Sequence, residues 1–179
     1  MTPQDFTALA KRVSDIEDRL TIYNLIAAHP PSADTGSGFY SEFVYAEDGV
    51  FDRGEGLSGA VGNANIGSFL HQPAHTAAIE NGLAHFVSLP HVEIKGDEAF
   101  VTSYHQIITP DHKAEPREVS NHGTSKGFRI HWVFANRWSL VRTKNGWKVK
   151  KRQLRPVDGS PPARELLKQA LDPYRGAAE

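Results

Sequence analysis

Hydrophobic positions near the N-terminus recur at alternating steps of three and four residues, which is the spacing of one face of an α-helix. The stripe consists of Phe6, Leu9, Val13, Ile16, Leu20, Leu25 and Ile26. Thr2-Pro3-Gln4-Asp5 supplies a hydroxyl N-cap, a first-turn proline and a first-turn acid, so the helix is expected to begin there. Pro30-Pro31 is expected to end it. We interpret the stripe as a packing face rather than as a ligand-binding surface.

Short elements are predicted between this helix and residue 82. They are a loop at 32–38 that contains Asp34, a helix at 39–44, a strand at 50–52, a helix near 65–71 and a loop or short helix at 72–82. The glycine-rich stretch 54–67 has neither a phosphate-loop lysine nor the G-x-G-x-x-G spacing that opens a helix. It therefore predicts turns rather than a phosphate-binding site.

The middle of the chain alternates between apolar and polar residues, and this pattern predicts a β-hairpin. Its first arm covers residues 83–94, its turn is Lys95-Gly96-Asp97-Glu98, and its second arm covers residues 99–108. Each arm carries a histidine among apolar neighbours on one face. These two residues, His85 and His105, are the first candidates for chemistry.

The C-terminal third predicts two more antiparallel strands. A polar, turn-rich connection at 110–126 precedes a long strand, which runs from Phe128 to Leu140 and is followed by the glycine turn Lys144-Asn145-Gly146, a last strand at 147–157 and a short helix at 160–172. Trp132, Phe134 and Asn136 share one face of the long strand, whereas Val133 and Ala135 share the other.

The order of elements predicts an α+β fold in a single domain of residues 1–179, with its core at about 12–157. Helices come first and long antiparallel strands follow, so the expected form is a cone-shaped α+β barrel. Its strongly curved antiparallel sheet would be closed by the N-terminal helices. Such a cone has an apolar interior with one mouth, where a small molecule is expected to bind.

Composition excludes several classes of partner. Twenty basic residues against twenty-one acidic ones leave a net charge of -1, so neither a nucleic acid nor a membrane surface is expected as partner. The chain has no cysteine, which excludes disulfides and thiol nucleophiles. It also has no signal pattern and no apolar run near the ~20 residues of a membrane span. We expect a cytoplasmic protein.

The nine histidines raise the question of a metal site. His71 and His75 are four residues apart, but Pro73 lies between them and no third ligand is apparent. We therefore expect neither a metal nor another cofactor.

With these elements in place, the chain resembles the nuclear transport factor 2-like superfamily, in the SnoaL-like branch that contains scytalone dehydratase. The likeness rests on four local matches in the same order and covers roughly residues 12–157. They are Asp34 before a short amphipathic helix, Ala84-His85-Phe86 at the first long strand, Tyr104-His105-Gln106 on the return strand, and Ala135-Asn136 eleven residues before Trp147.

The resemblance implies a role for each matching residue. Asp34 and His85 would form an acid/base dyad, while His105 and Asn136 would hold the leaving group or the carbonyl oxygen. Departures from scytalone dehydratase are Ala33, Phe134 and Phe51-Asp52, which stand where that enzyme has a tyrosine, a serine and a second tyrosine. They imply a more apolar pocket for an aromatic or polycyclic molecule. The pocket-lining candidates are Phe51, Trp132, Phe134, Asn136 and Arg152.

The chemistry of these residue types agrees with the implied roles. A carboxylate that binds one imidazole nitrogen fixes the tautomer and stabilises the imidazolium, while the other nitrogen removes a proton beside a carbonyl. We therefore expect a cofactor-independent lyase of the dehydratase type. An isomerase or aldol cyclase begins with the same step, and a non-catalytic ligand-binding protein is the alternative outside enzymes.

Two further expectations concern the surface. Arg152 either reaches the mouth and binds an anionic group or is an ordinary exposed arginine. Relatives in the dehydratase branch are commonly trimers that pack their outer sheet faces, so a homotrimer is expected. Val133 and Ala135 would suit that packing, whereas Arg129, His131 and Arg137 would need partners.

Overall fold

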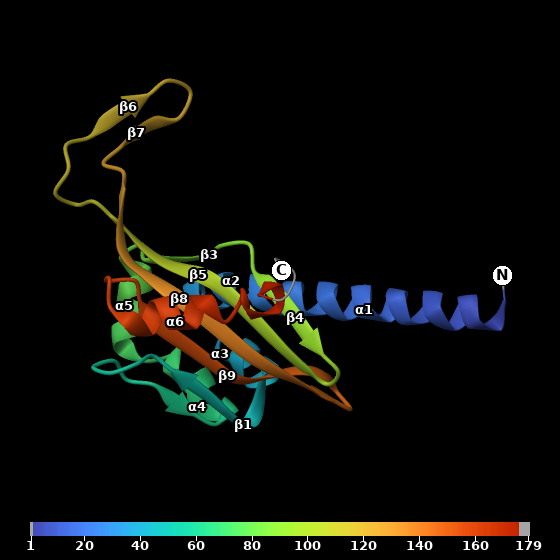
Figure 1. Ribbon diagram of the computed structural model, residues 1–179. Helices are drawn as coiled ribbons and strands as arrows, with labels where there is room; N and C mark the ends of the chain where they lie inside the picture. The colour runs from blue at the N-terminus through green and yellow to red at the C-terminus, as the bar shows by residue number, and fades with distance from the viewer. Residues whose placement is uncertain (1, 176–179) are drawn as a thin grey trace.

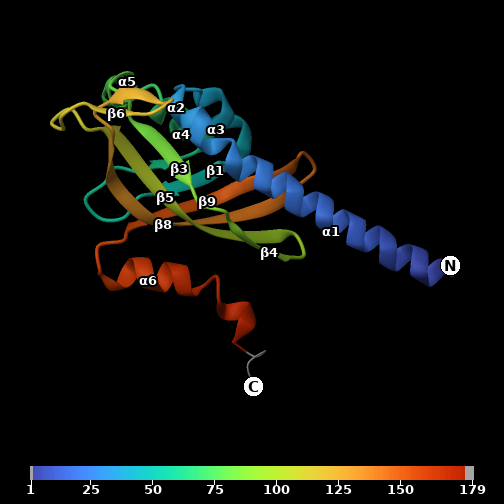
Figure 2. The ribbon, with the colours of Figure 1, turned by 90° about the horizontal axis from the view of Figure 1, so that it is seen from above.

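The structure is a computed structural model, which describes residues 2–175. A curved sheet forms its centre, and helices lie on both sides of it (Figures 1 and 2). The helices are α1 (Pro3–Ala27), α2 (His29–Asp34), α3 (Gly38–Val44), α4 (Asn63–Phe69), α5 (Pro73–Glu80), α6 (Pro161–Lys168) and the 3-10 turn η1 (Asp172–Tyr174). The strands are β1 (Tyr45–Asp52), β2 (Ala60–Val61), β3 (Ala84–Val87), β4 (His91–Lys95), β5 (Glu98–Pro110), β6 (Arg117–Val119), β7 (Gly123–Ser125), β8 (Phe128–Thr143) and β9 (Gly146–Pro156).

The main sheet has seven strands in the order β2-β1-β9-β8-β5-β3, with β4 also paired to β5. The long strands β5, β8 and β9 are antiparallel neighbours, as predicted. The pairing of β1 with β9 is parallel, so the sheet is mixed rather than wholly antiparallel. These two strands are far apart in the sequence, and their long connection leaves either direction open. The predicted α+β cone is confirmed with this change.

The first arm of the predicted hairpin is divided into two strands. β3 pairs with the second half of β5 and β4 with its first half. The break includes Pro90, which has no N–H to donate to a ladder. As a result, β3 is a short edge strand at the end of the sheet.

Helix α1 begins as predicted, with Thr2 and Asp5 forming a reciprocal capping box. Its apolar stripe, however, does not pack against the rest of the chain before its last turns. Phe6 is 68% exposed and Leu20 is 56% exposed, whereas Ile22 and Ile26 are fully buried. The reason is length, because the helix extends well beyond the sheet (Figure 1). The predicted packing face is therefore wrong for the first five turns within this chain.

The segment after α1 is helical where a loop was predicted. α1 ends at Ala27, and Pro30 lies in the first turn of a second helix, α2, instead of simply ending the first. Proline is tolerated there because first-turn N–H groups have no helical partner. Asp34 is the last residue of α2.

The core lies between the concave face of the sheet and helices α1 to α4. Its buried members come from the sheet and from α1, α3 and α4: Ile22, Ile26, Val44, Tyr45, Ile66, Val92, Ala99, Val101, Trp138, Leu140, Trp147 and Val149. This apolar layer holds the sheet and the helices in place around the cavity described below. Among the described residues, no helix is long and apolar enough to cross a membrane.

Helix α6 covers the outer face of the sheet (Figure 2). It packs Ala163 and Leu166 against Ala135 of β8, which is completely buried. Ala135 was expected to contact a neighbouring subunit, but the chain's own C-terminal helix occupies that position. The predicted use of Ala135 in subunit packing is therefore corrected.

The polar connection at 110–126 is exposed, as predicted. It also forms a small hairpin of its own, in which β6 pairs with β7, and it projects away from the body (Figure 1).

Candidate functional site

A cavity of about 310 Å³ lies between the concave face of the sheet and helices α2, α4 and α5. Its apolar lining includes Phe51, Phe69, Leu70, Leu83, Ile107, Phe134 and Leu154. Its polar lining includes four imidazoles and two guanidinium groups, from His29, His75, His85, His105, Arg53 and Arg152. The volume is at the lower end of the range for small-molecule sites, which suits a body of one or two rings.

The structure brings Asp34 and His85 together. Nδ1 of His85 lies 2.6 Å from Oδ1 of Asp34. The backbone N–H of His85 also donates to both carboxylate oxygens, at 3.1 Å each. This N–H is available because β3 is an edge strand. The carboxylate thus holds the residue by its main chain as well as by its ring.

The second ring nitrogen of His85, Nε2, differs from Nδ1 in its hydrogen bonding. His85 lines the cavity, and among the described residues Nε2 has no hydrogen-bond partner. A carboxylate accepts hydrogen bonds, so Nδ1 carries the proton and Nε2 carries the lone pair. The side chains of His85 and Asp34 are 11% and 28% exposed. This arrangement is that of a positioned base.

Arg152 forms the second polar cluster, on the floor of the cavity. Its side chain is 2% exposed. Nε donates to Oδ1 of Asn136 at 3.1 Å, Nη1 to Nε2 of His29 at 2.5 Å and Nη2 to Nδ1 of His105 at 3.4 Å. The guanidinium carbon also lies 4.3 Å from the ring centroid of Trp138. Burial lowers the pKa of Arg152 to about 10, so the group remains a cation at neutral pH.

The two imidazoles beside Arg152 are neutral. Burial lowers the pKa of His29 and of His105 well below the ordinary value, and the nearby Arg152 charge lowers both further. Arginine only donates hydrogen bonds, so it contacts the lone pair of each ring. For His105 this places the lone pair on Nδ1 and the proton on Nε2. His105 is then a neutral hydrogen-bond donor, and its ring centroid lies 5.3 Å from that of His85.

The remaining predicted residues are placed as follows. Phe51 and Phe134 line the cavity as expected, whereas Trp132 and Asn136 are not among its lining residues. Trp132 stacks on Phe134 at 5.2 Å. Asn136 is fully buried, and its amide contacts Arg152 and Ser103. The reading of Arg152 as an exposed residue is wrong, because the curved sheet encloses it.

Sequence reasoning missed three residues of this site. His29 begins α2 and packs edge-on against Trp138. His75 of α5 hydrogen-bonds the carbonyl of Ala33 at 2.9 Å. Arg53 follows β1, and its guanidinium lies 5.4 Å from the ring centroid of Phe69. One signal was available for Arg53: it is two residues after Phe51, and alternate residues of an extended chain share a face.

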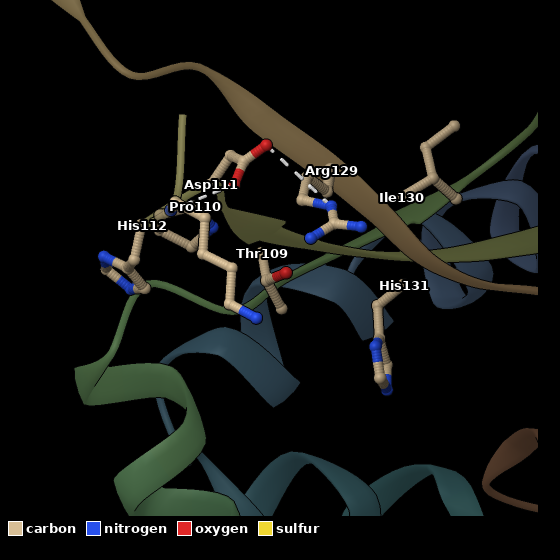
Figure 3. A pocket seen from close by; sticks show the side chains of 8 residues that line it. Thr109, Pro110, Asp111, His112, Arg129, Ile130 and His131 are labelled. Carbon is tan, nitrogen blue, oxygen red and sulfur yellow. Dashed lines mark hydrogen bonds and ion pairs between the residues drawn. The ribbon is translucent and has the colours of Figure 1, made fainter. Parts of the chain in front are cut away.

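A second hollow lies where β5 and β8 meet the projecting hairpin (Figure 3). Thr109 and His131 line it, together with Asp111 and Arg129, which form an ion pair at 3.9 Å. The Arg129 side chain is 62% exposed. This ion pair is open to solvent, so the hollow offers weaker chemistry than the imidazole-lined cavity.

Histidine is abundant in the cavity, yet its arrangement differs from that of a metal centre. Within residues 2–175, no three His, Asp or Glu side chains converge as metal ligands. The cavity imidazoles instead pair with Asp34, the Ala33 carbonyl and Arg152. Their lone pairs and protons are assigned by those contacts.

Fold and site together define a cone-shaped α+β protein with a histidine-lined cavity. The model of the SnoaL-like domain family matches residues 14–153, and the chain belongs to this family, within the NTF2-like superfamily. The predicted family resemblance is confirmed. A comparison with the curated proteins gave no match.

Solved structures show the same fold. An NTF2-like protein with a cystatin-like fold from Novosphingobium aromaticivorans is 32% identical, with a TM-score of 0.80 over 93% of this chain and 99% of that one. A protein from the same organism, provisionally described as an aromatic ring hydroxylase, is 26% identical, with a TM-score of 0.54 over 82% and 92%. Another, provisionally described as a scytalone dehydratase, is 17% identical, with a TM-score of 0.57 over 82% and 88%.

Proposed function

We propose that this protein is a lyase of the dehydratase type, which acts on an aromatic or alicyclic small molecule by general acid/base catalysis. One observation carries the proposal: the 2.6 Å hydrogen bond between Asp34 and Nδ1 of His85, a residue that lines the cavity and whose Nε2 has no hydrogen-bond partner within residues 2–175. The provisional description of a structural relative as a scytalone dehydratase agrees with it.

The proposed reaction uses residues that already lie in place. Nε2 of His85 removes a proton from the carbon beside a carbonyl, and Asp34 stabilises the imidazolium that forms. The Nε2–H of His105 donates to the carbonyl oxygen as it becomes an enolate. A neutral imidazole suits this task, and one such donor contributes roughly 3–4 kcal/mol to the transition state. The β-carbon–oxygen bond then breaks, and the His85 proton leaves with the hydroxyl group as water.

The structure changes the role of Asn136 in this scheme. Its amide oxygen accepts from Arg152 and its amide nitrogen donates to Ser103, both in the interior. We therefore assign Asn136 to positioning Arg152, and we assign substrate contact to His105 and Arg152. Phe51 and Phe134 would contact the rings of the substrate.

The test follows proton transfer in heavy water. Aromatic and alicyclic β-hydroxy ketones are incubated with the protein, and deuterium uptake at the α-carbon is measured alongside formation of the conjugated enone. We expect both with the wild type and a loss of about 10²–10⁴-fold with His85→Gln. His122→Gln, in the exposed hairpin, is the matched control and should leave both rates unchanged.

Two results would count against the proposal in different ways. Equal rates for the wild type and His85→Gln would remove His85 as the base. Deuterium uptake without loss of water would retain the base but replace the lyase with an isomerase or aldol cyclase, which share the first step.

A further inference from the structure

The cavity contains two arginines that have no acidic partner in the described part of the chain. Arg152 and Arg53 both line it. Phe51 pairs in register with Arg152 across the parallel strands β1 and β9, and Arg53 follows two residues after Phe51. All three therefore come from one corner of the sheet. Among residues 2–175, no carboxylate lies within ion-pair distance of either guanidinium.

Elsewhere a partly buried arginine, Arg155, and an exposed one, Arg142, are each paired with an acid. Arg155 binds both oxygens of Asp52, and Arg142 binds both oxygens of Asp18. Arg137 is the other buried arginine, and Glu93 and Asp172 act on it to offset the effect of burial on its pKa. For Arg152 the neighbouring groups are the Tyr45 hydroxyl, whose pKa burial raises to about 12 so that it is neutral, and a second cation, Arg53. The missing partner is therefore a local feature of the cavity.

The neighbours of Arg152 satisfy its hydrogen bonds but not its charge. Asn136, His29 and His105 are all neutral acceptors. A guanidinium has five N–H donors, so these three bonds and the contact with the neutral Tyr45 hydroxyl leave one for a ligand. Asp34 is the acid of this region, and its carboxylate is committed to His85. A buried cation without a counter-charge is costly, and an anionic ligand group would remove that cost.

We propose that the substrate is an anion: a one- or two-ring molecule whose carboxylate binds Arg152 on the cavity floor. Arg53 adds a second positive charge nearer solvent. The rings lie against the aromatic wall of Phe51, Phe69 and Phe134. This inference rests on the proposed function, because it names the substrate class for the same cavity.

Binding of matched probes tests the inference without turnover. Benzoate and 1-naphthoate are compared with benzamide and 1-naphthamide, which have the same rings without the charge, by isothermal titration calorimetry at neutral pH. A charge-assisted contact to a buried arginine predicts carboxylate affinity about 10- to 100-fold above that of the amide. Arg152→Gln should remove this preference, because it weakens carboxylate binding far more than amide binding.

Arg129→Gln is the matched control, because Arg129 lines the open hollow of Figure 3 rather than the cavity. It should leave carboxylate binding unchanged, and a loss would place the anion in that hollow and overturn the proposal. Equal affinity of acid and amide, or no binding of either acid at millimolar concentration, would also overturn it. The wild-type comparison needs no variant, so the inference stays testable if Arg152→Gln fails to fold.

The test of the anion site can fail or succeed independently of the test of the lyase reaction. Carboxylate binding that depends on Arg152, without deuterium exchange on any β-hydroxy ketone, would retain the anion site and reject the reaction. Exchange that depends on His85, with no preference for acids, would do the reverse.

Discussion

The two polar clusters of the cavity are built in opposite ways. Asp34 and His85 carry complementary partners, so each supplies what the other needs. Arg152 is more deeply buried and contacts neutral groups. In the first cluster the carboxylate and the imidazole are partners within the protein. In the second cluster, the described residues supply no negative charge to pair with the Arg152 guanidinium. On the two proposals, the first cluster serves the reaction and the second selects the ligand.

The largest effect should come from breaking the complete cluster. Asp34→Asn and His85→Ala are each expected to lower the deuterium-exchange rate by about 10²–10⁴-fold, because the two side chains act as one unit. The double variant should therefore lose no more activity than the single variant with the larger loss. Exchange rates of the wild type, the two single variants and the double variant form a double-mutant cycle. Additive losses would show that the residues work independently.

The second cluster can be completed by mutation. Asn136→Asp changes an amide into a carboxylate of the same shape, 3.1 Å from Nε of Arg152. We expect a gain of about 1–3 kcal/mol in the free energy of unfolding at neutral pH, because the buried cation acquires a counter-charge. The gain is measured by urea denaturation. The preference for carboxylates over amides should fall at least tenfold at the same time. Asn136→Ala is the control, since it removes the amide without adding charge.

The neutral imidazoles predict a pH dependence of stability. The pKa values of His29 and His105 are lowered in the folded state, so below about pH 6.5 the unfolded chain binds protons that the folded chain does not. Stability is retained above that pH and lost as the pH falls, by about 1.4 kcal/mol per pH unit for each histidine. Urea denaturation between neutral and mildly acidic pH measures the slope. His105→Asn should reduce it, and an unchanged slope would show that His105 does not contribute.

The smallest effect concerns Arg53. Arg53→Gln should lower the affinity for 1-naphthoate only a few fold, and added salt should weaken the wild-type contribution of this residue because it lies nearer solvent. The contribution of Arg152 should resist salt. Calorimetric titrations at low and high ionic strength distinguish the two arginines, and equal salt sensitivity would contradict their assigned depths.

The sequence predicted more of the fold than of the cavity. Alternation in β5 and β8 and the three-four spacing of α1 are local patterns, so they identified these elements. The same spacing carries no information on whether a partner surface exists, and Phe6 and Leu20 proved exposed. Pro90 is present in the sequence, but whether it divides the first arm into β3 and β4 depends on how the arm pairs with β5, which no local pattern shows.

Within the site, Asp34 and His85 were identified together only through the family resemblance, because fifty-one residues separate them. His29 was missed since it precedes two prolines, where a helix end was expected rather than a new helix. Arg152 was read more readily as a surface residue, because arginine is rarely buried without a partner. Its burial follows from sheet curvature and from contacts between distant residues, which no local pattern records.

Helix α2 has a geometric consequence for both clusters. His29 at its start reaches Arg152, and Asp34 at its end holds His85. Five helical steps separate these residues, a rise of about 7.5 Å along the axis. On the proposed function, this helix fixes the distance between the group that binds the carboxylate, Arg152, and the group that accepts the proton, His85. On the proposed binding mode, a molecule whose acidic carbon is too near to or too far from its carboxylate can contact Arg152 or His85, but not both.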